Sequence, residues 1–312
     1  MNKMKKIGLT ALAASLVSVS AQAVDISGGS SLTYAAGNDG ANGNPWSMND
    51  SLTFSWGGEL DNGFTVDMSF LLDNSDGAGA NIFDNRTLAI GMGDAGTLTF
   101  WGRSGSGVVG SFDDRTPNAY EESWTSGDSP NQGHSSANMF YYTNSMDAAT
   151  LHASYTPQGS GASASSEFGV VVTAVDNLEL YGAVGTDNGN GGAAVDNTIM
   201  GAKYTMGGAT VGLQQNKADS EAANGDEEFT AWSISYAVSE DLSVSYGSST
   251  IDYETNGTND QEATGISASY TMGSMTVAGT MNSIDNQGAG ATGAGNTDTN
   301  SDQYEINLSF AF

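Results

Sequence analysis

The last nine residues, Tyr304-Glu-Ile-Asn-Leu-Ser-Phe-Ala-Phe312, alternate between large apolar side chains and polar or small ones. A period of two residues is that of a β-strand with one apolar and one polar face. In a soluble protein the apolar face of such a strand is buried in a core. In an outer-membrane barrel this face meets lipid, and the polar face lines water. The rest of the chain decides between these two structures.

The same alternation recurs from residue 24 onward. The run from Leu52 to Trp56 precedes the turn residues 61–63, and a second alternating run follows from Phe64 to Leu72. The turn contains Asn-Gly, which is a strong hairpin signal between two alternating runs. Counting such segments predicts about sixteen strands, and no helical periodicity or domain boundary interrupts them.

The connections between these segments are of two kinds. Short turns are expected near 61–63, 93–96, 145–148, 176–177, 207–208, 239–241 and 273–274. Long polar connections are expected at 37–46, 74–82, 104–135, 157–166, 187–194, 218–226, 254–261 and 285–301. Short turns at one end and long loops at the other are typical of an outer-membrane barrel. Residues 24–312 are therefore predicted to form an all-β, transmembrane antiparallel β-barrel.

Residues 1–23 have the pattern of a secretory signal peptide. A basic segment with Lys3, Lys5 and Lys6 precedes the apolar stretch 7–19, and residues 21–23 (Ala-Gln-Ala) form a cleavage pattern. The alternative, a retained anchor helix, is disfavoured because the apolar stretch is short for a membrane-spanning helix. The chain is therefore predicted to be exported and cleaved after residue 23. It contains no cysteine, so no disulfide holds it together.

The charge of the chain is strongly negative. Without the three signal lysines, five basic residues stand against 36 acidic ones, which gives a formal charge of −31. Binding of nucleic acid is excluded as a function, because it needs basic patches. A disordered acidic protein is the alternative that composition alone allows. The 5 Trp, 12 Tyr and 11 Phe, together with the alternating runs, argue against it.

The longest connection runs from Ser104 to Ser136. A loop of this length in a compact domain is usually functional or disordered, and the aromatic residues Phe112, Tyr120 and Trp124 argue against disorder. It also carries a group of acidic residues, namely Asp113, Asp114, Glu121, Glu122 and Asp128. In the run before this loop Leu98 and Phe100 are expected to face lipid. By alternation Trp101 and Arg103 are then expected to face the lumen.

The stretch from Arg86 to Arg103 resembles the general bacterial porins, Gram-negative outer-membrane proteins, and especially their alphaproteobacterial type. Residues 86–92, the Gly-containing turn 93–96 and the strand 97–103 ending in Gly-Arg match the pattern of that family before its long third loop. The resemblance extends over the mature chain in strand rhythm. It implies a sixteen-stranded barrel, usually a homotrimer, with an inward-folded third loop and a water-filled channel for passive diffusion of small hydrophilic solutes and ions.

The resemblance also implies roles for single residues. Arg103 is the expected wall arginine of the pore constriction, opposed by the loop acids Asp113, Asp114, Glu121 and Glu122. Phe312 is the expected assembly signal, with the barrel-assembly machinery as its partner. Arg86 shares the alternation of the lipid-facing Leu88 and Ile90, so it is expected at the rim or next to a β-bulge.

This sequence departs from the family in its few basic wall residues. Alternation assigns a small set of further residues to the pore wall: Asp67, Asp73, Trp101, His152, Glu179, Lys203 and Glu305. Acidic residues outnumber basic ones in this set, and rings of Asp or Glu favour cations in a pore. The channel is therefore predicted to be cation-selective. The alternative is that the acids mostly occupy the outer loops and leave the constriction neutral.

No catalytic or metal site is expected. His134 and His152 lack partners at metal-ligand spacing, and no Gly-x-Ser-x-Gly nucleophile motif occurs in a strand–helix context. Residues 298–302 resemble the start of a calcium loop but lack its Gly and its distal Glu. We expect no cofactor beyond weak binding of divalent cations by acidic loops, and we expect outer-membrane lipid and lipopolysaccharide as partners. The alternative functions are a secreted acidic β-rich adhesin or calcium-stabilised module, and, less favoured, a barrel enzyme.

Overall fold

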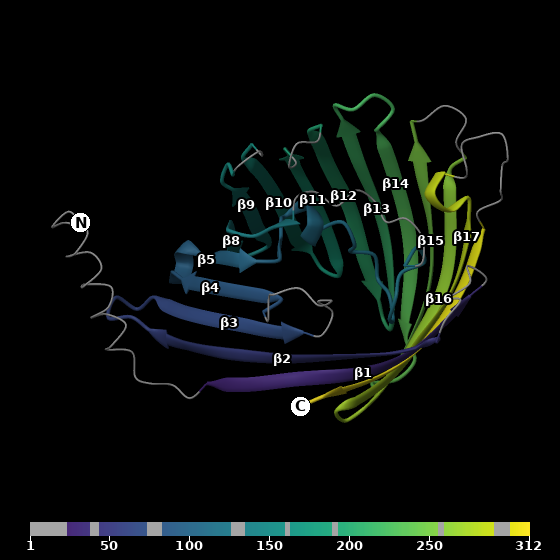
Figure 1. Cartoon of the computed structure of the whole chain (residues 1–312), viewed down its shortest axis with the longest axis horizontal. Coiled ribbons are helices and arrows are strands. Elements are labelled where there is room, and N and C mark those ends of the chain that lie inside the picture. The colour runs from purple at the N-terminus through teal and green to yellow at the C-terminus, as the bar shows by residue number, and fades with distance from the viewer. Residues whose placement is uncertain are drawn as a thin grey trace.

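The computed structural model describes residues 24–37, 44–73, 83–125, 135–159, 163–188, 193–254, 259–289 and 300–312. Within these residues, sixteen antiparallel strands close into a barrel in which each strand pairs with its neighbours and β1 pairs with β18. Figure 1 shows the strands following one another around the barrel, with the segment after β5 crossing inside the ring. The closed all-β barrel predicted from the alternation is confirmed.

The first half of the barrel contains the strands β1 (Asp25–Gly37), β2 (Trp46–Glu59), β3 (Thr65–Asp73), β4 (Asn85–Gly91), β5 (Thr97–Arg103), β8 (Met139–Met146), β9 (Ala149–Thr156) and β10 (Ser165–Val175). The second half contains β11 (Leu178–Asp187), β12 (Val195–Met206), β13 (Ala209–Ser220), β14 (Glu227–Ala237), β15 (Leu242–Tyr253), β16 (Gln261–Met272), β17 (Met275–Asp285) and β18 (Ser301–Ala311). The short strands β6 (Gly105–Ser106) and β7 (Ser135–Ser136) are not part of the barrel sheet. Three 3₁₀ turns are also present, namely η1 (Gly93–Ala95), η2 (Val109–Ser111) and η3 (Gln287–Ala289).

The apolar residues of the alternating runs lie on the outside of the barrel. In the final strand Tyr304, Ile306 and Phe310 are 47%, 57% and 45% exposed, so they are not packed in a core. The predicted hairpin forms, with Leu52 opposite Leu72. Since direct partners project from the same face, the apolar residues of neighbouring strands form one continuous outer surface. This is the surface that a bilayer would cover.

The strands extend further into the long-loop end than the sequence predicts. Residues 218–220 continue β13, and Ser220 pairs with Val195 of β12 although the residues there are polar. Hydrogen bonding between neighbouring strands does not depend on apolar side chains, so the ladder continues beyond the apolar band. Among the described residues, no helix is long and apolar enough to cross a membrane. Residues 1–23 lie outside the described residues, so the signal peptide stays a prediction.

A β-bulge interrupts the pairing of β4 and β5. Thr87 pairs with Trp101 and Arg86 pairs with Arg103, so Gly102 is the extra residue. The alternation counted from Leu98 therefore does not hold at Arg103, because Arg103 is the direct partner of Arg86 and direct partners share a face of the sheet. Counting from Leu98 placed Arg103 on the lumen side, whereas its pairing places it on the same face as Arg86. The role of Arg103 at the constriction stays a prediction.

Candidate functional site

The long third connection packs against the polar inner face of the barrel. Its base is closed by the short pairing of β6 with β7. Beyond β6, the turn η2 places Val108, Val109 and Phe112 in a buried apolar cluster with Tyr181 and other residues of β11 and β12. Gly169 of β10 permits this close approach, because a Cβ atom there would collide with Val108 and Phe112.

A buried carboxylate holds the start of η2. Glu167, which is 1% exposed, accepts hydrogen bonds from the backbone N–H of Val109 (3.0 Å) and from the Ser154 hydroxyl (2.9 Å) at the same oxygen, Oε2. Ser154 in turn accepts a hydrogen bond from the N–H of Val108 at 3.1 Å. A buried carboxylate that accepts from N–H and O–H donors makes strong, charge-assisted hydrogen bonds. These bonds fix the first part of the loop on β9 and β10.

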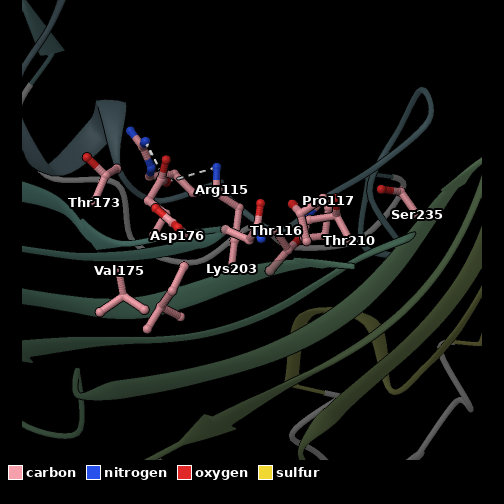
Figure 2. Close-up of a pocket in the computed structure, with 13 residues that line it drawn as sticks. Arg115, Thr116, Pro117, Thr173, Val175, Asp176, Lys203, Thr210 and Ser235 are labelled. Atoms are coloured by element: carbon pink, nitrogen blue, oxygen red, sulfur yellow. Dashed lines mark hydrogen bonds and ion pairs between the residues drawn. The ribbon is translucent and has the colours of Figure 1, made fainter. Parts of the chain in front are cut away.

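Arg115 joins the middle of the loop to the wall. Its Nη2 atom lies 3.0 Å from Oε1 of Glu179, and Nζ of Lys203 lies 2.9 Å from the same oxygen (Figure 2). The guanidinium carbon also lies 4.9 Å from the ring centroid of Phe112 and 5.1 Å from that of Tyr181. Two aromatic rings and one carboxylate therefore hold this cation, and both interactions favour a fixed orientation.

The rest of the loop is held by polar side chains of the inner wall. These bonds include those from Ser233 Oγ to the Pro117 carbonyl (2.8 Å), from the Ala119 N–H to Ser245 Oγ (2.9 Å), from the Tyr120 N–H to Ser267 Oγ (3.1 Å) and from Asn282 Nδ2 to the Glu122 carbonyl (3.2 Å). Small hydroxyl side chains allow the loop backbone to come close and satisfy its donors and acceptors. These polar contacts of the loop thus run along the wall from β14 to β17.

The far end of the described loop is anchored by an aromatic contact. Trp124 packs edge-on against Phe229, with ring centroids 4.9 Å apart, in a second buried apolar cluster. Just before it, the Tyr120 hydroxyl donates a 2.6 Å hydrogen bond to Glu305 of β18. Burial and this bond to a carboxylate raise the pKa of Tyr120, so the phenol stays protonated.

The four predicted loop acids lie close together. Asp113 is buried, and its carbonyl accepts hydrogen bonds from the side chains of Gln214 and Asn216. The carboxyl group of Asp114 is hydrogen-bonded to that of Glu122. Glu121 accepts a 3.1 Å hydrogen bond from Thr125 Oγ1. The loop therefore carries a compact acidic cluster, Asp113, Asp114, Glu121 and Glu122.

Burial and mutual repulsion make these carboxyl groups weaker acids. Desolvation, followed by the charge of Glu122, raises the pKa of Asp113 to about 7 and that of Asp114 to about 8. The pKa of Glu121 is raised by the same two effects. The acidic cluster therefore shares protons near neutral pH, and its charge grows as the pH rises.

The predicted wall residues occupy different parts of the barrel. Glu179 binds both Arg115 and Lys203, while His152 contacts Phe112 and lies 3.1 Å from the Tyr141 hydroxyl. Trp101 of β5 lies against Gly105 at the start of the loop.

The remaining predicted residues lie on β3 and at the chain end. Asp67 lines a pocket of about 440 Å³ and Asp73 one of about 250 Å³. Phe312 exchanges two 2.9 Å backbone hydrogen bonds with Gly28, and the residue is 77% exposed. Among the described residues, no group of three or more His, Cys, Asp or Glu side chains could hold a metal ion. The weaker calcium-like stretch at 298–302 and His134 fall wholly or partly outside the described residues.

Two residues of the site, Arg115 and Glu167, were not identified from the sequence. Arg115 was not assigned because it lies in a loop, where alternation gives no direction, although a single basic residue among acids was a visible signal. Glu167 fell at the edge of an expected loop, at 157–166. Its neighbour Phe168 is 60% exposed on the outer face. Since adjacent residues of a strand point to opposite faces, this alternation could have placed Glu167 inside.

The comparisons agree with this geometry. The family model described as Gram-negative porin matches residues 8–253. The barrel is similar to the structure of OmpT, an outer membrane protein of Vibrio cholerae, with a TM-score of 0.70 and 14% identity over 95% of this chain and 100% of that one. Its trimer form gives 0.72 and 13% over 93% and 99%. A triple mutant of Rhodopseudomonas blastica porin gives 0.68 and 17% over 93% and 100%. The search of curated protein sequences gave no match.

Proposed function

The chain belongs to the Gram-negative porin family and forms an outer-membrane porin channel, and we propose that this channel passes small hydrophilic solutes by passive diffusion with a preference for cations. The observation that carries the preference is the acidic cluster on a loop that lies against the inner wall. Fixed carboxylates along a pore attract cations and repel anions.

The distribution of basic residues supports the same conclusion. Of the five basic residues in the proposed mature chain, Arg115 and Lys203 share the carboxylate of Glu179, and Lys217 lies 2.7 Å from Glu228. These ion pairs reduce the positive field that the three cations contribute. The total charge of the chain attracts cations toward the entrances in addition.

The test is the reversal potential of the purified channel in a planar bilayer under a KCl gradient. Replacing three acids of the cluster, by Asp114→Asn with Glu121→Gln and Glu122→Gln, is expected to lower the K⁺/Cl⁻ permeability ratio by roughly a factor of two or more. The matched control changes Glu240→Gln and Asp241→Asn in the turn after β14, where no effect on selectivity is expected. A ratio that is unchanged by the loop variant would show that the constriction does not set the selectivity.

We also propose a homotrimer inserted in outer-membrane lipid and lipopolysaccharide, assembled by the barrel-assembly machinery through Phe312 after removal of residues 1–23, without enzymatic activity. The apolar outer face supports the lipid contact and disfavours a secreted soluble module. The trimer form of the Vibrio cholerae protein supports the oligomer. Light scattering of the detergent-solubilised protein tests it, since a monomer mass in a detergent that preserves native porins would contradict the trimer.

A further inference from the structure

A pocket of about 620 Å³ lies beside the loop, at the short-turn end of the barrel wall. The pocket is lined by Arg115 of the loop and by Glu179 and Lys203 of the wall. Asp176 of the short turn after β10 and the hydroxyl-bearing residues Thr210 and Ser235 also line it. Figure 2 shows Asp176 on one side of Lys203 and the two hydroxyl-bearing residues on the other. Its volume is within the range of small-molecule sites.

The cations of this pocket retain donors for a ligand. Arg115 and Lys203 both bind Oε1 of Glu179, and their side chains are 23% and 26% exposed. An ammonium group has three N–H donors and a guanidinium has five. One carboxylate neutralises only one of the two cations, so the Arg115–Glu179–Lys203 group carries a net charge of about +1. Asp176 brings the pocket back to neutrality, with the two signs on different residues.

The charge of the chain decides which ligand class fits. A free anion is repelled by the strong negative charge of the barrel, and a free cation is attracted to many carboxylates without distinction. A zwitterion has no net charge, so it meets no such repulsion, and its two ends fit a pocket that offers both signs. The hydroxyls of Thr210 and Ser235, which are direct partners in β13 and β14, add neutral hydrogen-bonding groups.

We propose that this pocket is a weak binding site for small zwitterions of the α-amino acid class. Lys203 and Arg115 bind the carboxylate, and Asp176 binds the ammonium group. Because Glu179 and Lys203 of its lining lie on the inner face, the ligand binds during passage and leaves again. This inference rests on the proposed diffusion channel and adds a solute class to it.

The experiment measures K⁺ current through single channels at pH 6 with three added probes. L-alanine is the zwitterion, N-acetyl-L-alanine the matched anion, and L-alaninamide the matched cation. L-alanine is expected to reduce the current and to add excess noise that saturates with concentration. The variant Lys203→Gln is expected to weaken the binding of L-alanine, measured from this block, about tenfold, because one charge-assisted hydrogen bond is lost. Lys217→Gln removes the same charge from the outer-facing side of β13 and serves as the matched control.

The outcomes separate this inference from the channel itself. Saturating block by L-alanine above that of both other probes, with dependence on Lys203, supports the site. Equal or stronger block by N-acetyl-L-alanine, equal block by L-alaninamide, or conducting channels that do not respond to L-alanine would each overturn it and leave the channel standing. Folded protein that gives no KCl conductance would overturn the proposed diffusion function first.

Discussion

Replacement of Glu167 by alanine is expected to free the first part of the loop without unfolding the barrel. The change leaves the N–H of Val109 and the hydroxyl of Ser154 without their buried acceptor. A buried donor left unsatisfied costs about 1–3 kcal/mol, so the two together cost about 2–6 kcal/mol of local stability. The barrel hydrogen bonds of β10 use backbone atoms and are retained.

Hydrogen–deuterium exchange of the amides of Val108 and Val109 measures this local opening. A loss of about 2 kcal/mol corresponds to an exchange rate roughly 30 times faster, and larger losses give more. Open-channel current noise is expected to rise in the same variant, because a mobile loop changes the width of the pore. Glu167→Gln keeps an acceptor oxygen and is expected to give a smaller effect. Glu262→Ala, an exposed acid of β16, is the control.

One result would refute this reasoning. If amide exchange at Val108 and Val109 were unchanged in Glu167→Ala while the protein remained folded by circular dichroism, the apolar cluster around Phe112 would hold the loop by itself. The hydrogen bonds of Glu167 would then contribute nothing to its position.

Three further predictions concern the same loop. The pKa values of Asp113 and Asp114 are raised to about 7 and about 8, so these groups gain negative charge as the pH rises. The K⁺/Cl⁻ permeability ratio should therefore increase between about pH 6 and pH 9. A reversal potential that stays constant over this range would contradict the prediction. Gly169→Val should overpack the first apolar cluster at a cost of about 1–3 kcal/mol, seen as faster amide exchange in residues 107–112, and an unchanged rate would show that the cluster has room. Trp124→Ala should remove the contact with Phe229 at a cost of about 3–5 kcal/mol and speed exchange in residues 117–125 alone, whereas unchanged exchange there would show that the polar bonds suffice.

The alternation of side chains determined the fold class. A strand contributes one residue to each face in turn, so the hairpin of β2 and β3 and the faces of its strands follow from local sequence and the turn at residues 61–63. The same pattern put His152, Glu179 and Lys203 on the inner face. There His152 contacts Phe112 of the loop, Glu179 binds Arg115 of the loop, and Lys203 binds Glu179. The lengths of the connections likewise indicated which end carries the loops.

Only the tertiary structure decided how the loop uses that inner face. The bulge at Gly102 depends on the pairing of two strands and reverses the count at Arg103. The meeting of Arg115 with Glu179 and Lys203, and of Val109 with Glu167, joins residues more than fifty positions apart. A local period describes which side of a strand a residue occupies. It contains no information on where a long loop will lie, because that position exists only after the barrel has closed and the buried donors and charges of the loop have found partners on its wall.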